Sequence, residues 1–182
     1  ISLPSFYEHV KTLDQTVEVD YFLPGCPPVA EQVGAVLNVI LEGKLPEAGA
    51  VVGIDDKTNC DVCTRTKSQN GPVRIKEFKR PHEVIIDPEI CFLEQGLICA
   101  GPATSAGCGL PCIQGNMPCR GCYGPPEGVE DQGAKLLSAI AAIIDAESAE
   151  DVESIMDTIV DPLGTCYRFN LSNSILSELK YR

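Results

Sequence analysis

The spacing of ten cysteines constrains this 182-residue chain more than any other feature. Eight of them lie between residues 60 and 122, and two pairs, Cys60 with Cys63 and Cys119 with Cys122, have the spacing Cys-x-x-Cys. Such a short loop brings two thiolates to one metal ion or to one edge of a metal cluster. Disulfide frameworks are more typical of small secreted domains that lack a core. The spacing therefore favours metal ligation.

The number of cysteines separates zinc from iron–sulfur chemistry. Two Cys-x-x-Cys pairs could form one all-thiolate zinc site, but four of the eight cysteines would then have no role. Eight cysteines divide more naturally into two sets of four, the number that one [4Fe–4S] cubane needs. The sets are Cys108, Cys112, Cys119 and Cys122, within the Gly- and Pro-rich stretch 107–126, and Cys60, Cys63, Cys91 and Cys99. We predict two cubanes, with a zinc-stabilised non-redox binding module as the alternative.

Charge and hydropathy exclude several classes of partner. A net charge of −12 argues against binding to nucleic acid, whose phosphates need a basic surface. A membrane span needs about 20 apolar residues, and the longest candidate, residues 136–144, is too short. Protein and small-molecule partners remain.

The N-terminal part of the sequence predicts one strand, one turn and one helix of an α/β fold. Residues 17–23 alternate partly in polarity, as a strand does, and run directly into the turn around Cys26. Prolines suit the start of the helix that follows, and apolar residues recur with a helical period through Leu41. Gly43, followed by Pro46, ends the helix. Cys26 is therefore expected at the carboxyl end of a strand, where open α/β folds generally place ligands.

The rest of the chain divides into a loop-rich segment and a helical one. Residues 45–130 contain many turns and few apolar periods, so they are expected to be organised by clusters, with only short helices. Residues 132–158 predict two helices separated near 147–150, the second opened by acidic residues that favour a helix N-terminus.

Four motifs, in this order, resemble the small subunits of nickel–iron hydrogenases. They are Leu23-Pro-Gly-Cys-Pro-Pro28, Cys60-x-x-Cys63-Thr-Arg65, Cys91-Phe-Leu-Glu-Gln-Gly-Leu-Ile-Cys99-Ala-Gly-Pro102 and Met117-Pro-Cys-Arg-Gly-Cys122. The resemblance runs from about Val17 to about Tyr167 and is greatest to the cytoplasmic methyl-viologen-reducing, deazaflavin-non-reducing type of methanogenic archaea. It implies a cytoplasmic protein connected with methanogenesis.

The resemblance assigns each cysteine set to a cluster. It implies that Cys26 is a ligand of the proximal cluster, the one nearest the nickel–iron site. It implies a distal cluster at Cys60, Cys63, Cys91 and Cys99, and a medial cluster at Cys108, Cys112, Cys119 and Cys122. Better-known relatives have His at the place of Cys60, so an all-thiolate distal site of lower potential is expected. Many members have Pro at the place of Cys112 and a [3Fe–4S] centre, so [4Fe–4S] is expected here.

The resemblance also implies a domain organisation. Small subunits of this family begin with a flavodoxin-like domain that supplies the remaining proximal ligands, and no such segment precedes Ile1. We therefore expect a C-terminal portion, in which residues 1–50 end the flavodoxin-like domain and 51–182 form the medial and distal cluster-binding domain. The chain would then hold two complete [4Fe–4S] clusters and one ligand of a third.

The function implied is electron transfer. Electrons from H2 oxidation in a nickel–iron large subunit would pass through proximal, medial and distal clusters to an iron–sulfur or flavin protein, such as a heterodisulfide reductase complex. The chain would be a non-catalytic subunit of an oxidoreductase, with no catalytic residue of its own. A stand-alone iron–sulfur carrier is an alternative, but its usual Cys-x-x-Cys-x-x-Cys-x-x-x-Cys-Pro runs are absent.

Three features outside the cysteine sets allow two interpretations. Cys166 has no partner nearby in the sequence and is expected to be a small buried hydrophobe. His82 could replace a distal ligand, but a solvated loop residue is favoured because four thiolates are available. The basic stretch 76–82 could dock an acidic electron partner or be ordinary surface.

Overall fold

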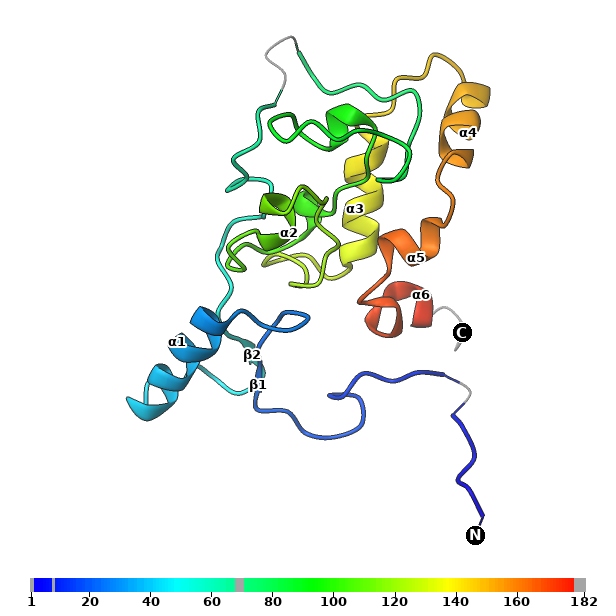
Figure 1. The fold of residues 1–182 in the computed structure, drawn as a ribbon. Coiled ribbons are helices and arrows are strands. Elements are labelled where there is room, and N and C mark those ends of the chain that lie inside the picture. Colours follow the sequence, from blue (N-terminus) through cyan, green and yellow to red (C-terminus); the bar gives the residue numbers. More distant parts are fainter. Residues whose placement is uncertain (1, 8, 68–70, 179–182) are drawn as a thin grey trace.

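A parallel pair of short strands joined by a helix forms the N-terminal unit (Figure 1). In this computed structural model, which describes residues 2–7, 9–67 and 71–178, strand β1 is Tyr21–Phe22, helix α1 is Ala30–Leu41 and strand β2 is Ala50–Val51. Tyr21 lies opposite Ala50 and Phe22 opposite Val51. Parallel strands need a crossover connection, which α1 supplies. The predicted strand–turn–helix is confirmed, although the strand is shorter than 17–23.

The apolar stripe of α1 remains largely exposed. Leu37 is 53% and Leu41 84% exposed, and the buried residue of this helix is Gln32. The Gln32 amide donates to the carbonyl of Gly53 (3.0 Å), which also accepts from the Tyr123 hydroxyl (3.4 Å). These two bonds connect the strand–helix–strand unit to the cysteine-rich segment. A complete flavodoxin-like domain stays a prediction.

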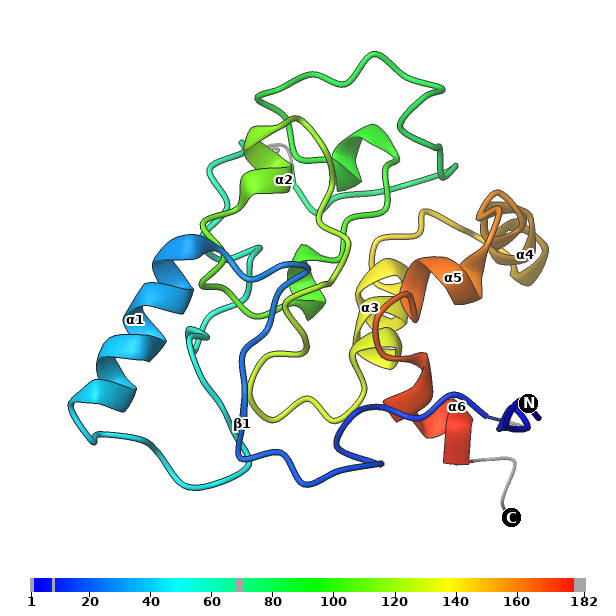
Figure 2. The same cartoon turned by 60° about the horizontal axis from the view of Figure 1, so that its bottom comes forward.

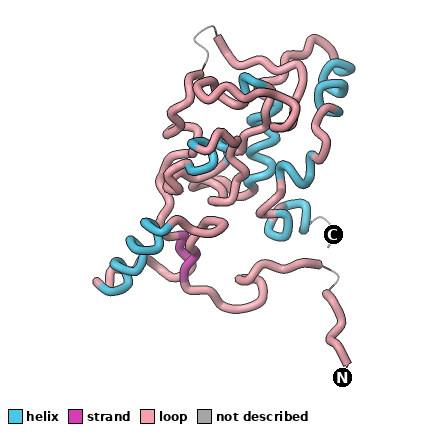
Figure 3. The backbone as a smooth tube through the Cα atoms, in the orientation of Figure 1, coloured by secondary structure: helices cyan, strands magenta, loops and turns pink. Residues whose placement is uncertain are grey.

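The cysteine-rich segment is mostly loop, as predicted (Figure 3). Its regular elements are two 3-10 helices, η1 at Leu93–Gln95 and η2 at Gly101–Ala103, and the single-turn helix α2 at Pro111–Gln114. Such short pieces contribute little stability of their own. The path of the chain is instead set by hydrogen bonds between distant loops and by packing against the helices that follow.

Four helices form the C-terminal layer beside these loops (Figure 2). Helix α3 is Gln132–Ala141 and α4 is Ala149–Asp157, which confirms the two helices predicted in 132–158. Asp131 caps α3, and Ser148 with Asp151 forms a capping box at the start of α4. The shorter α5, Pro162–Cys166, and α6, Ile175–Glu178, follow, with the 3-10 helix η3 at Leu171–Asn173 between them.

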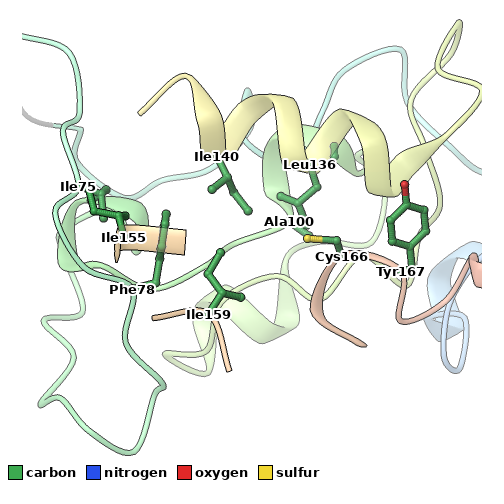
Figure 4. Close-up of a cluster of buried hydrophobic side chains, with 10 residues drawn as sticks. Ile75, Phe78, Ala100, Leu136, Ile140, Ile155, Ile159, Cys166 and Tyr167 are labelled. Carbon is green, nitrogen blue, oxygen red and sulfur yellow. The ribbon is translucent and has the colours of Figure 1, made fainter. Parts of the chain in front are cut away.

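The main hydrophobic core lies between the cysteine-rich loops and the helical layer. Leu136 and Ile140 of α3 pack there with Ile155 of α4, while Ile75 and Phe78 come from the loop side (Figure 4). Backbone hydrogen bonds from Ile75 to Ile143 (2.8 Å) and from Asp145 to Ile75 (2.9 Å) connect the two layers. A second, smaller cluster consists of Phe92, Leu97, Cys99 and Ile113.

In the described part of the chain, no helix has the length and apolar character needed to cross a bilayer.

Candidate metal centres

The four cysteines of the predicted distal set line one pocket. Cys60, Cys63, Cys91 and Cys99 all belong to its wall. Three distant loops are held together there: the Cys60 amide donates to the carbonyl of Gly101 (3.2 Å), and the Cys91 amide donates to that of Thr66 (2.9 Å). Thr58 and Asp61 exchange side-chain hydrogen bonds across the turn that carries Cys60. Local turn chemistry and long-range backbone pairing thus bring together cysteines that are up to 39 residues apart.

Arg65 fixes the outer loop of this pocket. Its side chain is buried, and one guanidinium nitrogen donates to the carbonyls of Asp87 (2.7 Å) and Ile90 (2.8 Å). The other terminal nitrogen donates to the amide oxygen of Asn116, and the guanidinium carbon lies 3.7 Å from the centre of the Phe92 ring. A planar fork that also stacks on an aromatic face is a role that Lys cannot fill. Arg65 therefore sets the position of the loop that leads into Cys91.

The electrostatics of this pocket disfavour free thiolates but would compensate a bound anionic cluster. Burial raises the pKa of Cys99 to about 12 and also raises the pKa of Cys91. Burial by itself lowers the pKa of Lys67, but the negative charge of Cys60 and a side-chain hydrogen bond to Cys60 raise it above the ordinary value. The Lys67 ammonium also donates to the Cys60 carbonyl (3.2 Å). Among the described residues the lining has two cations, Arg65 and Lys67, and no carboxylate. An anionic group held by four thiolates would be compensated here.

The predicted medial set lines a second, wider pocket of about 450 Å³. Cys112 lies in α2, while Cys108, Cys119 and Cys122 lie in the loops around it. Gly121, between the last two cysteines, has a φ of +91°, and a Cβ there would lie 3.2 Å from the amide of Gln132. Burial raises the pKa of both Cys119 and Cys122. A bound metal would be needed to keep these thiols deprotonated at neutral pH.

Cys26 also reaches the second pocket. It lies on the turn after β1, whose Gly25 has a φ of +132°, and a Cβ at Gly25 would lie 2.5 Å from the Cα of Pro28. Only glycine fits this turn without displacing the backbone. Cys26 itself is exposed. The structure thus places the predicted proximal ligand beside the predicted medial set.

Two residues line both pockets, Asn59 and Ile113. Asn59 is 1% exposed, and its side chain contacts two sulfurs: its amide nitrogen donates to Cys119 Sγ and its oxygen accepts from the Cys108 thiol, each at 3.6 Å. Sequence reasoning missed both residues, as it missed Lys67. Nothing in the sequence marks Asn59 except its place directly before a Cys-x-x-Cys pair.

The residues outside the two sets have other surroundings. Cys166 is 5% exposed and packs in the main core near Ala100 and Leu136, which confirms it as a buried small hydrophobe (Figure 4). His82 is exposed and is absent from the described lining of the distal pocket. With Arg80, Arg120 and Arg168 it lines a separate hollow of about 300 Å³.

The donor chemistry of each pocket fits an iron–sulfur cubane. Among the described residues, no three Cys, His, Asp or Glu side chains are arranged as the ligands of a single metal ion. The distal pocket instead has four thiols around a space, and the second pocket has the four of the medial set together with Cys26. Four thiolates are the ligands of one [4Fe–4S] cluster. In the thiol form the distal space is narrow, about 20 Å³, so the side chains there would have to turn outward around a cluster.

The chain is similar to known hydrogenase subunits. It is 35% identical over its whole length to the iron-sulfur subunit of an F420-non-reducing hydrogenase from Archaeoglobus profundus, of which it covers 56%. It is 37% identical, over 96% of its length and 55% of the relative, to the corresponding F420-non-reducing hydrogenase chain of Methanothermobacter marburgensis. An F420-non-reducing hydrogenase chain from Methanothermus fervidus is 41% identical over 63% of this chain and 91% of its own length.

The chain spans about half the length of the first two of these relatives, 56% and 55%. No protein-family model matches it.

Proposed function

This chain belongs to a family of F420-non-reducing hydrogenase subunits, and on that premise we propose that it is the part of such a subunit that holds the medial and distal [4Fe–4S] clusters. Cys60, Cys63, Cys91 and Cys99 would hold the distal cluster, and Cys108, Cys112, Cys119 and Cys122 the medial one. Cys26 would contribute one ligand to a proximal cluster. Each cubane, when bound, takes up and releases one electron at a time.

The observation that carries the proposal is the sorting of the eight cysteines into two pockets of four. The two sets divided on the basis of the sequence line separate pockets, and Cys26 joins the medial set in the wider one. The relative from Archaeoglobus profundus is named an iron-sulfur subunit, which favours cubanes over zinc. The described lining of the distal pocket adds Arg65 and Lys67, whose positive charges would partly offset the low potential expected of an all-thiolate site.

The protein around the clusters positions them and excludes water. Phe92, Leu97 and Ile113 are buried beside the distal thiols, and Tyr123 is buried beside the medial ones. A dry, hydrogen-bonded surrounding sets the potential of an iron–sulfur centre. The chain would contribute no catalytic residue to the oxidoreductase reaction.

The partners follow from the family. We propose a nickel–iron large subunit that oxidises H2 as the electron donor, and an iron–sulfur or flavin protein such as a heterodisulfide reductase complex as the acceptor. Electrons would pass through proximal, medial and distal clusters in that order. A cytoplasmic location in methanogenic metabolism belongs to the same proposal.

Iron and acid-labile sulfide analysis of the anaerobically purified protein tests this proposal. We expect about eight irons bound by the two sets in each chain, and EPR signals of two interacting [4Fe–4S] clusters after dithionite reduction. Cys91→Ala and Cys112→Ala should each disturb one cluster and leave the other. Cys166→Ala is the matched control, because this thiol is buried in the core, and it should retain all of the iron.

Zinc without sulfide would contradict the proposal and support the zinc-stabilised module. Loss of iron in Cys166→Ala to the same extent as in Cys91→Ala would contradict the ligand assignment.

A further inference from the structure

Asn59 is a buried polar side chain in the wall between the two cysteine pockets. Its backbone amide donates to the carbonyl of Thr104 (2.8 Å), and the next residue along the chain is the distal ligand Cys60. Its side chain points the other way, to the sulfurs of Cys108 and Cys119 in the medial set, each 3.6 Å away. Asn59 is thus joined to the distal ligand Cys60 by a peptide bond, and its side-chain amide contacts two medial sulfurs.

The chemistry of the sulfurs decides what Asn59 can do there. A thiol can donate to the amide oxygen, as Cys108 does in this structure, but a thiolate has no proton to donate. Once the medial cysteines are cluster ligands, the two hydrogens of the Asn59 amide nitrogen are the only groups of this side chain that can bond to those sulfurs. A buried amide left without a partner is destabilising, so this donation is strongly favoured.

The second residue of the wall between the pockets, Ile113, is apolar, so an apolar side chain also fits there. Ile113 lines both pockets, is buried and packs with Phe92 and Leu97. Packing alone therefore does not require an amide at position 59. The amide adds a hydrogen-bond donor directed at one site and leaves the sulfurs of the other site untouched.

We propose that Asn59 is a positioning residue that raises the reduction potential of the medial cluster relative to the distal one. The proposal rests on the clusters proposed above. A donor to a ligand sulfur stabilises the reduced cluster, which carries one more negative charge, more than the oxidised one. When the medial and distal clusters exchange an electron, the cluster that loses it is oxidised and the other is reduced. No bond or proton moves in this step. Asn59 shifts the equilibrium of this electron toward the medial cluster.

Asn59→Leu in the assembled hydrogenase complex tests the proposal, with both potentials measured by EPR-monitored redox titration. Leucine has a similar volume and no donor. We expect the medial potential to fall, changing the electron distribution between the clusters about tenfold, which is about 59 mV for a one-electron couple. The distal potential should stay unchanged. Ile140→Leu, a buried apolar change in the main core outside both pockets, is the control and should move neither potential.

The outcomes separate this inference from the proposed function. If the wild-type complex lacks iron and sulfide at these sites, the proposed function fails. If Asn59→Leu keeps wild-type iron and both potentials are unchanged, the proposed function stands and the inference is overturned. If Asn59→Leu does not assemble, Asn59→Asp keeps the size, removes the donor and should lower the medial potential further. Loss of iron in both variants, with iron retained in Ile140→Leu, would make Asn59 a scaffold residue and also overturn the inference.

Discussion

Cys166 differs from the other cysteines with a shifted pKa because burial is the single cause of its shift. Burial raises the pKa of its thiol above the ordinary value of 9.0. The folded chain therefore holds this proton more firmly than the unfolded chain does. The resulting contribution to the free energy of unfolding is complete below about pH 9 and is lost as the pH rises through the folded pKa.

A urea-unfolding series at rising pH measures this contribution. We expect the unfolding midpoint of the cluster-loaded protein to fall more steeply above pH 9 than that of Cys166→Ala, which lacks the group. At pH 8 the native thiol should also resist alkylation while unfolded protein reacts. Equal slopes in the two proteins would show that Cys166 titrates alike in the folded and unfolded chains.

The grouping of the cysteines by pocket could be predicted from the sequence, whereas the residues around them could not. Short loops limit how far apart the two thiols of a Cys-x-x-Cys pair can lie, and the division of eight cysteines into sets of four did the rest; that they bind metal stays a prediction. Asn59 owes its position to chain segments far away, such as Cys119, which is 60 residues from it. No local pattern reports such a contact.

Helix α3 contains a glycine whose small size is required by a neighbour. A Cβ at Gly133 would lie 2.4 Å from the ring of Tyr167, a residue of the main core just after α5. Replacing glycine by alanine inside a helix normally stabilises it by about 1 kcal/mol. Here the overpacking cost of about 1–3 kcal/mol should exceed that gain.

Gly133→Ala should therefore lower the thermal unfolding midpoint. Gly34→Ala in α1 is the matched control, because a Cβ there would meet nothing within 4 Å, and it should raise the midpoint by the helix-propensity gain. Differential scanning of the two variants beside the parent measures both effects. A rise in both would mean that Tyr167 can shift without loss.

Length explains which elements the sequence could predict. Helices α1, α3 and α4 have nine to twelve residues, enough for an apolar stripe to repeat. Helices α2, α5 and α6 have four or five residues, and β2 has two, so no period can be recognised. Contacts with the surrounding chain stabilise these short elements, so their boundaries could not be predicted from the local sequence.

On the proposed function, the chain would depend on metal for a part of its stability. Among the described residues between 52 and 131 the helices are η1, η2 and α2, and cluster binding there would contribute directly to folding. The helical layer has its own core of Leu136, Ile140, Ile155 and Ile159. The two layers should therefore respond differently when the clusters are removed.

Amide hydrogen exchange after iron removal by a chelator tests this difference. We expect faster exchange at the amides of Cys60, Cys91 and Ala100, whose backbone bonds connect the loops, and retained protection in α3. The unfolding midpoint should fall by on the order of 10 °C. Uniform loss of protection would show that α3 also depends on the clusters.

The wall formed by Asn59 and Ile113 has a consequence for survival in air. Because the same two side chains line both pockets, oxidative loss of a cluster from one pocket would open the inner face of the other cluster to solvent and to oxygen. The second cofactor should then decay faster than the first. A population exposed to oxygen would consist mostly of intact and fully inactivated molecules, with few that retain a single centre.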